Sequence, residues 1–445
     1  MTGPVVKPVT IIGAGLAGCE AAWQASIRGV PVRLFEMKPA RYSPAHRSPG
    51  LAELVCSNSF RSESLDSAVG ILKREMTMMN SLIMEAAAAC RVPAGRALAV
   101  DRKLFSAYIE DRLCSRDNCR IKRVEVADIP DDIPLVIASG PLTSNKLADA
   151  IAELTGSTGL FFYDAISPVI ETESIDFGRV FMASRYQEGE GDYINCPLDR
   201  DEYENLHREI MAGREIQLND FEDRRCFEGC LPIEVLARRG IDTLRYGPMK
   251  PVGLTDPRTG KQPWAVVQLR RENLQGSLYN MVGFQTKLAY PEQKRIFRMI
   301  PGLDSAEFAR YGSIHRNTFI DSPRLLTEHL ELRSRPGVFF AGQITGVEGY
   351  LESAASGLFA GINAALLAGG SSCPPPPPET AIGALVAHVT NRDALPFQPM
   401  NVNFGLFPRP EKRIGKKERG AFRACRSAEH LVRWKSTVDS QVFLS

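Results

Sequence analysis

Two cysteines lie in sequence contexts that favour thiol chemistry. A thiol attacks as the thiolate, and neighbouring cationic or hydrogen-bonding groups lower its pKa. Cys56 is followed by polar side chains that can hold an anion or lower the pKa of a thiol, namely Ser57, Asn58, Ser59 and Arg61. Cys230 lies in RRCFEGCLPIE, between a glycine and a Leu-Pro turn, with two arginines upstream. We therefore take Cys56 and Cys230 as the candidate catalytic residues among ten cysteines.

Cys226 precedes Cys230 by four residues and leaves a second interpretation open. Flavin disulfide reductases use closely spaced cysteines, so a redox disulfide between these two is an alternative to a single nucleophile. The sequence has no C-x-x-C pair and its six histidines are scattered, so we predict no metal site.

The stretch VTIIGAGLAGCEAAWQASIRGVPVRLFE, residues 9–36, predicts the unit that positions a ligand near such thiols. It reads as a strand, a glycine turn, a helix and a second strand, which is a dinucleotide-binding βαβ unit. Glu36 ends the second strand, where a carboxylate accepts hydrogen bonds from an adenosine ribose. The helix N-terminus favours a pyrophosphate. The predicted cofactor-binding residues of this unit are Gly13, Ala14, Gly15, Leu16, Ala17, Gly18 and Glu36.

A second glycine motif appears late in the chain, in VFFAGQITGVEGYLESAASGLFAGINAALL, residues 338–367. It repeats the strand, turn and small-residue helix, and its helix N-terminus would stabilise negative charge on a reduced flavin ring. Gly342 of this motif is a further cofactor-binding candidate. An early motif for the adenosine diphosphate half and a late one for the flavin half favour FAD over NAD as the tightly held cofactor. This pattern is typical of glutathione-reductase-like flavoproteins.

Between these motifs the sequence pattern changes to short β-rich segments that are separated by glycines and prolines. We predict an α/β protein, a glutathione-reductase-like Rossmann FAD-binding domain with an inserted β-rich α+β domain. The FAD-binding domain would comprise residues 1–160 and 311–445, and the insertion residues 161–310. Prolines 374–378, with Cys373, predict a stiff linker over 373–378.

Composition predicts a cytoplasmic protein with no membrane span. The 54 basic and 52 acidic side chains nearly cancel, and the N-terminal apolar run contains glycines where a signal peptide would be continuous. Ten cysteines without framework spacing suggest reduced thiols. Charge is nevertheless concentrated in residues 409–426, which hold eight basic and two acidic side chains. Such a run is either a solvated tail or a contact for an anionic polymer such as RNA.

Four segments together resemble one family: GAGLAGCEAAW, LVCSNSFRS, FEGCLPIE and FFAGQITGVEGYLESAASGLFAG. The resemblance is to the bacterial folate- and FAD-dependent tRNA (uracil-5-)-methyltransferases, the TrmFO family, which are relatives of the MnmG (GidA) tRNA-modifying flavoproteins. It runs through most of the chain, and the two cysteine motifs are far more specific than the glycine fingerprint.

The resemblance implies formation of 5-methyluridine at position 54 in the T-loop of tRNA. Methylenetetrahydrofolate would supply the carbon, reduced FAD the electrons, and NAD(P)H would regenerate the flavin. Carried over by motif, Cys230 adds to uracil C6, Cys56 is the second functional thiol near the flavin, and Tyr350 lies beside the isoalloxazine ring. Uracil C5 becomes nucleophilic only after a thiolate adds at C6, so this reaction requires a nucleophilic cysteine.

The partners implied are tRNA, folate and NAD(P)H, and no feature marks a specific protein partner. A T-loop base must be turned outward to react. Candidate phosphate contacts are the 409–426 run and the basic residues Arg238, Arg239, Arg245, Lys250, Arg270 and Arg271. Three other functions remain open: MnmG-like wobble-uridine modification, an NAD(P)H-dependent flavin oxidoreductase without RNA, and a non-catalytic RNA-binding flavoprotein. One argument against MnmG-like modification is that proteins of the MnmG family are considerably longer and have a C-terminal helical extension.

Overall fold

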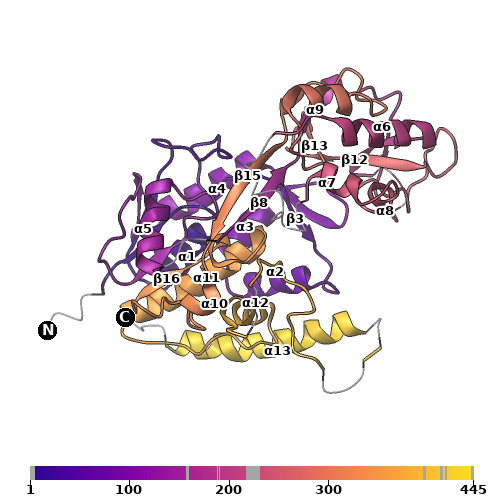
Figure 1. Cartoon of the computed structure of the whole chain (residues 1–445). Coiled ribbons are helices and arrows are strands. Elements are labelled where there is room, and N and C mark those ends of the chain that lie inside the picture. Colours follow the sequence, from indigo (N-terminus) through magenta and orange to yellow (C-terminus); the bar gives the residue numbers. More distant parts are fainter. Residues whose placement is uncertain are drawn as a thin grey trace.

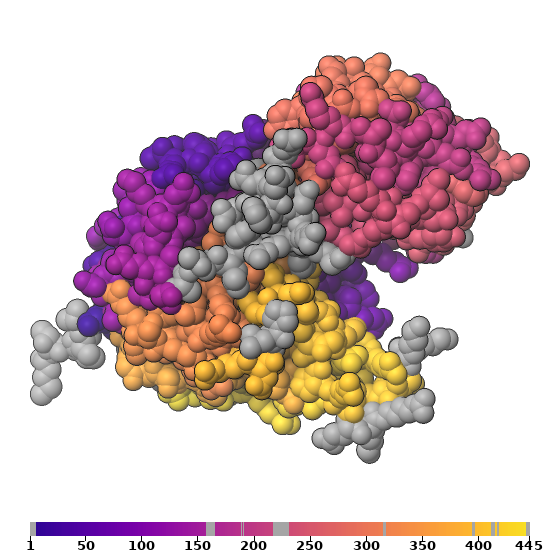
Figure 2. Space-filling model, viewed as in Figure 1, coloured from indigo at the N-terminus to yellow at the C-terminus, as the bar shows by residue number. Residues whose placement is uncertain are grey.

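The chain folds into two lobes, shown in Figure 1, with both termini at the larger one. The computed structural model describes residues 6–156, 160–187, 189, 191–216, 231–393, 397–410, 414–415 and 418–441. The smaller lobe is formed by the middle of the chain. In the space-filling view of Figure 2, the surface is indented at the right, between the smaller lobe and the C-terminal third of the chain.

A five-stranded parallel sheet forms the centre of the larger lobe. Its order is β16 (Val338–Phe340), β7 (Leu135–Ile137), β1 (Val9–Ile12), β2 (Val32–Glu36) and β6 (Cys119–Arg123). The register pairs Val9 with Val32 and Thr10 with Leu135. Strands β1, β7 and β16 are fully buried and mainly apolar, as expected of a parallel sheet covered on both faces. The early and late glycine motifs, far apart in sequence, thus share one sheet.

Helices α1 (Leu16–Ile27) and α11 (Tyr350–Ala368) pack against each other unusually closely. A Cβ added at Gly357 would lie 2.2 Å from the Ala17 carbonyl oxygen, and one at Gly361 would lie 2.6 Å from the Ala21 Cα. The small residues of the late motif therefore serve helix–helix contact. Among the described residues, α11 is the one helix long and apolar enough to cross a membrane, and most of it is buried inside the fold.

The rest of the larger lobe surrounds this sheet. Its N-terminal elements are β3 (Ser59–Ser62), α2 (Ala68–Met78), α3 (Leu82–Ala89), β4 (Arg91–Val92), β5 (Ala97–Val100), α4 (Arg102–Cys114) and α5 (Asn145–Thr155). Strands β3, β5 and β4 form a small antiparallel sheet. Helices α2 and α3 follow each other closely along the chain. Asn80 adopts a left-handed conformation between them, with φ of 58°, and Ser81 caps the second helix.

The smaller lobe is built on a six-stranded sheet with antiparallel pairing. Its order is β10 (Phe181–Ala183), β11 (Tyr193–Leu198), β12 (Ala265–Arg271), β13 (Leu278–Met281), β9 (Val169–Glu171) and β14 (Phe308–Arg310). Its helices are α6 (Arg200–Ala212), α7 (Ile233–Arg238), α8 (Thr243–Tyr246), α9 (Tyr290–Phe297) and the short η1 (Thr172–Ser174). They enclose a separate hydrophobic core. Strands β8 (Leu160–Ile166) and β15 (Ser313–Phe319) pair antiparallel and connect the lobes (Figure 1). The predicted α/β fold with an inserted β-rich domain is confirmed.

The C-terminal segment packs onto the larger lobe. It comprises α10 (Ser322–Leu325), η3 (Gln343–Thr345), α12 (Ala381–Thr390) and α13 (Arg419–Ser440), in addition to β16 and α11. The buried Glu75 carboxylate of α2 accepts hydrogen bonds from the backbone of Ala381 and Ile382 and from the Ser427 hydroxyl. Trp434 Nε1 donates to the Pro374 carbonyl. Helices α12 and α13 are therefore anchored to α2, and the proline-rich segment to α13.

Candidate functional site

The glycine turn between β1 and α1 opens into a cavity that we call the dinucleotide pocket. Gly13 has φ of +97°, and a Cβ at Gly18 would lie 1.8 Å from the Gly13 carbonyl oxygen, so both glycines are needed for the turn to pack on its helix. Gly15 differs, because a Cβ there meets no protein atom within 4 Å and would enter the cavity. This space beside a helix N-terminus suits a pyrophosphate.

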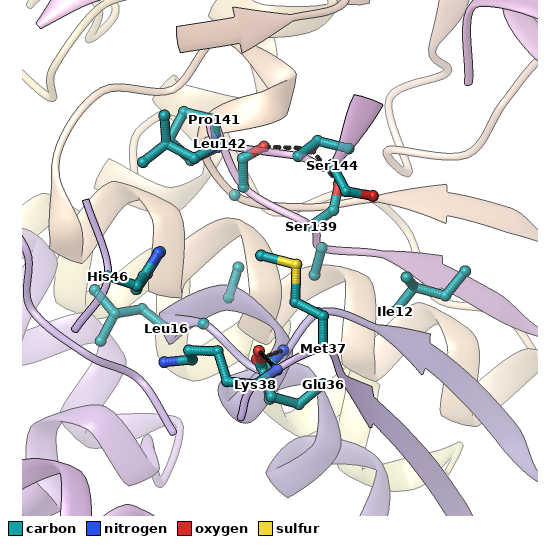
Figure 3. Close-up of a pocket in the computed structure, with 18 of the residues that line it drawn as sticks. Ile12, Leu16, Glu36, Met37, Lys38, His46, Ser139, Pro141, Leu142 and Ser144 are labelled. Atoms are coloured by element: carbon teal, nitrogen blue, oxygen red, sulfur yellow. Dashed lines mark hydrogen bonds between the residues drawn. The ribbon is translucent and has the colours of Figure 1, made fainter. Parts of the chain in front are cut away.

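Glu36 lies at the carboxyl end of β2, on the rim of the dinucleotide pocket (Figure 3). Its carboxylate accepts hydrogen bonds from Ala14 N at 3.1 Å and Lys38 N at 3.0 Å. Lys38 is itself buried, with Nζ 2.7 Å from the Gly50 carbonyl oxygen and 3.3 Å from the Glu53 carboxylate. These contacts fix Glu36 and tie the loop after β2 to the pocket.

The late motif completes the dinucleotide pocket. Gly342 N donates to the Ser356 hydroxyl at 2.7 Å, which holds the turn after β16 against α11. Of the nine predicted cofactor-binding residues, eight line this pocket. Gly18 alone does not, because it packs on Gly13. The remaining walls come from Met37, His46 and the segment after β7, several of which Figure 3 labels.

A second cavity, the junction pocket, adjoins the first between the two lobes. The two cavities share Val55, Pro141, Leu142, Gln343 and Tyr350. The junction pocket is also lined by Ala45, Cys56, Ser57, Ser59, Arg61, Ile166, Ser167, Arg270, Asn280, Val282, Gly283, Gln285, Asn317, Glu348, Gly349 and Asn401. A ligand bridging both cavities would pass beside Tyr350.

Tyr350 connects the late motif to Cys56. Its hydroxyl oxygen accepts hydrogen bonds from Cys56 N at 2.7 Å and Ser57 N at 3.0 Å. Burial raises the pKa of this phenol well above its usual value, so it stays neutral at ordinary pH. The half-buried Cys56 has its Sγ 3.7 Å from the Ala165 carbonyl oxygen. The structure therefore brings the predicted thiol and the predicted tyrosine together at the boundary between the cavities.

Two partly buried arginines hold the chain that carries Cys56. Arg102 donates to the Leu54 carbonyl and Arg310 Nη1 to the Val55 carbonyl at 2.9 Å. Burial, with the nearby Arg102 charge, lowers the pKa of Arg310 to about 10. Arg102 also pairs with Glu272 of the smaller lobe. This segment is thus fixed by residues from both lobes.

The predicted phosphate contacts fall into different environments. Arg270 is buried, with Nε 3.0 Å from Asn58 Oδ1 and Nη2 2.7 Å from Ser57 Oγ, so it belongs to the junction pocket and not to an outer surface. Arg245 stacks over Trp264, 3.9 Å from the ring centroid. Arg238 pairs with Glu215, whereas Arg239 is exposed and Lys250 and Arg271 are partly exposed.

The basic run at 409–426 is only partly free to contact a partner. Arg426 pairs with Glu379, and the Arg423 guanidinium lies 4.7 Å from the Phe404 ring centroid. Arg409 and Arg419 are both exposed. Residues 411–413 and 416–417 lie outside the described residues, as do Cys226 and Cys230.

Sequence reasoning missed most of the junction pocket. Asn280, Gln285, Asn317 and Asn401 come from separate segments and carry no local motif. Gln343 and Glu348 lie inside the late glycine motif, and their side chains hydrogen bond at 2.8 Å. Only these two had a usable signal, namely polar residues in a turn that faces a predicted cofactor.

Comparison with known proteins identifies relatives along nearly the whole chain. A family model described as glucose inhibited division protein A matches residues 8–372. A protein of Syntrophus aciditrophicus named methylenetetrahydrofolate--tRNA-(uracil-5-)-methyltransferase TrmFO is 58% identical over 434 residues, covering 97% of this chain and 98% of the relative. A protein of the same name from Geobacter sulfurreducens is 58% identical over 439 residues, covering 98% and 100%.

Solved structures show the same fold at much lower identity. Aquifex aeolicus GidA, in its form II crystal, has a TM-score of 0.70 and 18% identity, covering 99% of this chain and 74% of the other. The form I crystal gives 0.69 and 19%, covering 98% and 78%. The resemblance inferred from the motifs is confirmed. The family model spans most of the chain and the relatives match nearly end to end, so the chain belongs to the glucose inhibited division protein A family and, within it, to the TrmFO group.

Proposed function

We propose that this protein forms 5-methyluridine in the T-loop of tRNA, using the one-carbon group of methylenetetrahydrofolate. The observation that carries the proposal is the 58% identity, over 97–98% of the chain, to proteins named for this reaction. The two adjoining pockets support it, because the reaction needs a cofactor and two further ligands in one place.

FAD is the cofactor that fits the dinucleotide pocket. The open space at Gly15, beside the N-terminus of α1, accommodates a pyrophosphate, and Glu36 is positioned for the ribose. Residues 13–17, Glu36, Gly342 and Tyr350 would hold it, while Gly18 lets α1 pack against the glycine turn. When bound and reduced by NAD(P)H, FAD supplies the two electrons that turn a methylene group into a methyl group.

Cys230 is the proposed nucleophile. Its thiolate adds to uracil C6, and C5 then attacks the methylene carbon of the folate and loses its proton. The C–N bond to tetrahydrofolate breaks to leave an exocyclic methylene group. A hydride, which reduced FAD would supply, converts that group to methyl as the thiolate leaves C6. Ile233 follows Cys230 by three residues in the sequence, and its backbone N–H donates to the Gln285 carbonyl at 2.7 Å. Gln285 lines the junction pocket. Three residues span at most about 11 Å, which supports a thiol within reach of that pocket.

Cys56 is the proposed second functional thiol. It lies where the two pockets meet and is fixed through its backbone to Tyr350. A thiol there would contact the flavin side of the site, while Cys230 would approach from the smaller lobe. In this arrangement Cys56 would contact the flavin and Cys230 would contact the uracil.

The tRNA would approach the gap between the lobes with its target base turned outward. Arg239, Lys250 and Arg271 are solvent-accessible cations of the smaller lobe that support this orientation. We propose a cytoplasmic location, where tRNA, folate and NAD(P)H are available, and a division into residues 1–160 and 311–445 around an inserted 161–310.

The decisive experiment incubates purified, FAD-loaded protein with unmodified tRNA, methylenetetrahydrofolate and NADPH, and analyses the nucleosides by mass spectrometry. We expect 5-methyluridine that requires the folate. Product at the wobble uridine would instead support MnmG-like modification. NADPH turnover without any tRNA product would support a flavin oxidoreductase, and tRNA binding without turnover a non-catalytic binder.

A further inference from the structure

The floor of the junction pocket is formed by two neighbouring strands of the smaller lobe. Arg270 of β12 lies directly opposite Asn280 of β13 in the antiparallel register. Directly opposite residues project from the same face of a sheet. The Arg270 guanidinium reaches Ser57 and Asn58 of the larger lobe, so this face of the sheet is turned toward the site.

The side-chain nitrogen of Asn280, Nδ2, is unpaired within the described residues. Asn280 is only 3% exposed, yet its Nδ2 makes no hydrogen bond within the described part of the chain. Leaving a buried polar group unpaired is unfavourable, because its hydrogen bonds to water are lost and not replaced. A ligand in the pocket would remove this cost, because Asn280 lines the cavity.

Other polar groups around Asn280 are also uncommitted. Ser167 and Asn317 are buried lining residues, and their side chains form no hydrogen bond with a described residue. Arg270 uses Nε and Nη2 on the larger lobe, which leaves Nη1. The pocket therefore presents a side-chain amide beside a fixed positive charge.

We propose that Asn280 is a specificity-determining residue that pairs with the lactam edge, C(=O)–NH, of a planar heterocycle in the junction pocket. A carboxamide offers one donor and one acceptor side by side, which matches a carbonyl next to a ring N–H. Arg270 stabilises the negative end of that carbonyl. Both the pterin of folate and the uracil of tRNA present this edge, so the inference rests on the proposed function and names the chemistry they share.

The test measures binding to the FAD-loaded protein for Asn280→Ala and Asn280→Asp, with Asn273→Ala as the matched control. Asn273 lies in the exposed turn that joins the same two strands. In one arm, tetrahydrofolate is titrated and the flavin absorbance followed. In the other, filter binding compares a T-arm hairpin carrying the target uridine with the same hairpin carrying an abasic residue.

We expect both Asn280 variants to weaken one arm by about 10-fold while Asn273→Ala does not. Weakened tetrahydrofolate binding identifies the pterin, and a reduced preference for uridine over the abasic residue identifies the base. Changes below about 2-fold in both arms, with FAD retained, overturn the inference. If the unaltered protein binds neither tetrahydrofolate nor the hairpin, it is the proposed function that fails.

A second measurement does not depend on the folding of a variant. The unaltered protein is tested with a 2,4-diaminopteridine in place of a pterin and with cytidine in place of the target uridine. Each exchange replaces the carbonyl of the lactam edge by an amino group. We expect about 10-fold weaker binding in one of the two exchanges. Equal binding in both would contradict recognition of a lactam edge.

Discussion

The dinucleotide pocket and the junction pocket adjoin each other but are built differently. The first is shaped mainly by backbone, with a glycine turn, a helix N-terminus and a strand end from one short stretch of chain. The second is assembled from side chains of both lobes, including Cys56, Arg270 and Asn280. Backbone shape suits a cofactor common to many proteins, whereas converging side chains suit recognition of particular substrates.

The cations near the two pockets are also balanced differently. Lys38, at the dinucleotide pocket, has the Glu53 carboxylate 3.3 Å away. Arg310, a partly buried residue behind the junction pocket, donates to the backbone carbonyls of Val55 and Cys56 and forms no ion pair with a described carboxylate. The junction pocket thus places more unbalanced positive charge near its ligands. Such charge favours anionic transition states, as when an enolate forms on uracil.

Replacing Cys230 by alanine is the change with the largest expected effect, and it separates the two pockets. We expect Cys230→Ala to lower the methylation rate by at least about 10³-fold, because no thiolate can activate uracil C5. Bound FAD should be unchanged, because Cys230 is not among the residues proposed to hold FAD. Single-turnover assays and the flavin absorbance of the purified variant measure the two properties.

Cys226→Ala is the matched control for that variant, and we expect it to keep its activity. Equal loss of activity in both single variants would favour a redox disulfide between Cys226 and Cys230. Full activity in Cys230→Ala would exclude this residue as the nucleophile.

Gly15 and Gly18 test the backbone character of the dinucleotide pocket. Gly15→Val places a side chain in the cavity at a residue whose φ of −73° suits any amino acid, so we expect a folded protein with at least about 100-fold weaker FAD binding. Gly18→Ala drives a Cβ into the Gly13 carbonyl and should destabilise the fold by about 1–3 kcal/mol. Flavin content and urea unfolding distinguish the two effects. Normal FAD content in Gly15→Val would show that the cofactor lies elsewhere.

The difference between the pockets explains what the sequence could predict. The glycine turn and Glu36 lie within residues 9–36, so their spacing alone predicts their arrangement. Asn280 lies in an ordinary strand, and its role arises only because β13 pairs with β12 and faces the other lobe. Residues brought together from distant segments leave no local pattern.

The clusters of basic residues in the sequence show where the chain is positively charged, but they do not show which residues those side chains contact. The run at 409–426 predicts a basic surface, yet the partners of Arg426 and Arg423 are Glu379 and Phe404, which no spacing rule connects. Arg270 was predicted on the same grounds as a phosphate contact and is buried between the lobes. Burial of a cation depends on tertiary packing, which net charge does not report.

Tyr350→Phe tests whether the Tyr350 hydroxyl, at the boundary between the pockets, orders the loop around Cys56. The change removes the acceptor of two backbone N–H groups, at Cys56 and Ser57, and leaving each unpaired costs about 1–3 kcal/mol. We expect FAD to be retained and activity to fall roughly 10- to 100-fold as the loop around Cys56 loosens. Because burial raises the pKa of Tyr350, no alkaline limb of the wild-type profile should depend on it.

Tyr290→Phe is the matched control for that variant, since Tyr290 is an exposed tyrosine of the smaller lobe. Steady-state rates, flavin content and thermal unfolding are compared across the three proteins. Unchanged activity and stability in Tyr350→Phe would mean that the hydrogen bonds to Cys56 and Ser57 do not organise the site.

Lys73→Met gives the smallest expected effect and tests the buried charge beneath the junction pocket. Lys73 Nζ donates to the carbonyls of Arg61 and Ser62 on β3, and burial lowers its pKa to about 8 from an ordinary value of 10.5. Between these pH values the unfolded chain binds more protons than the folded one, so this residue makes stability rise with pH across that window. Below about pH 8 both states are protonated and the slope vanishes.

We therefore expect the free energy of unfolding of the wild type, relative to Lys73→Met, to increase by roughly 1–2 kcal/mol from about pH 7.5 to about pH 9.5. Urea unfolding at both pH values measures it, and the difference between the proteins cancels other titrating groups. If the free energy of unfolding changes equally with pH in the wild type and in Lys73→Met, burial of the Lys73 charge does not destabilise the fold. The two pockets would then differ only in their shapes.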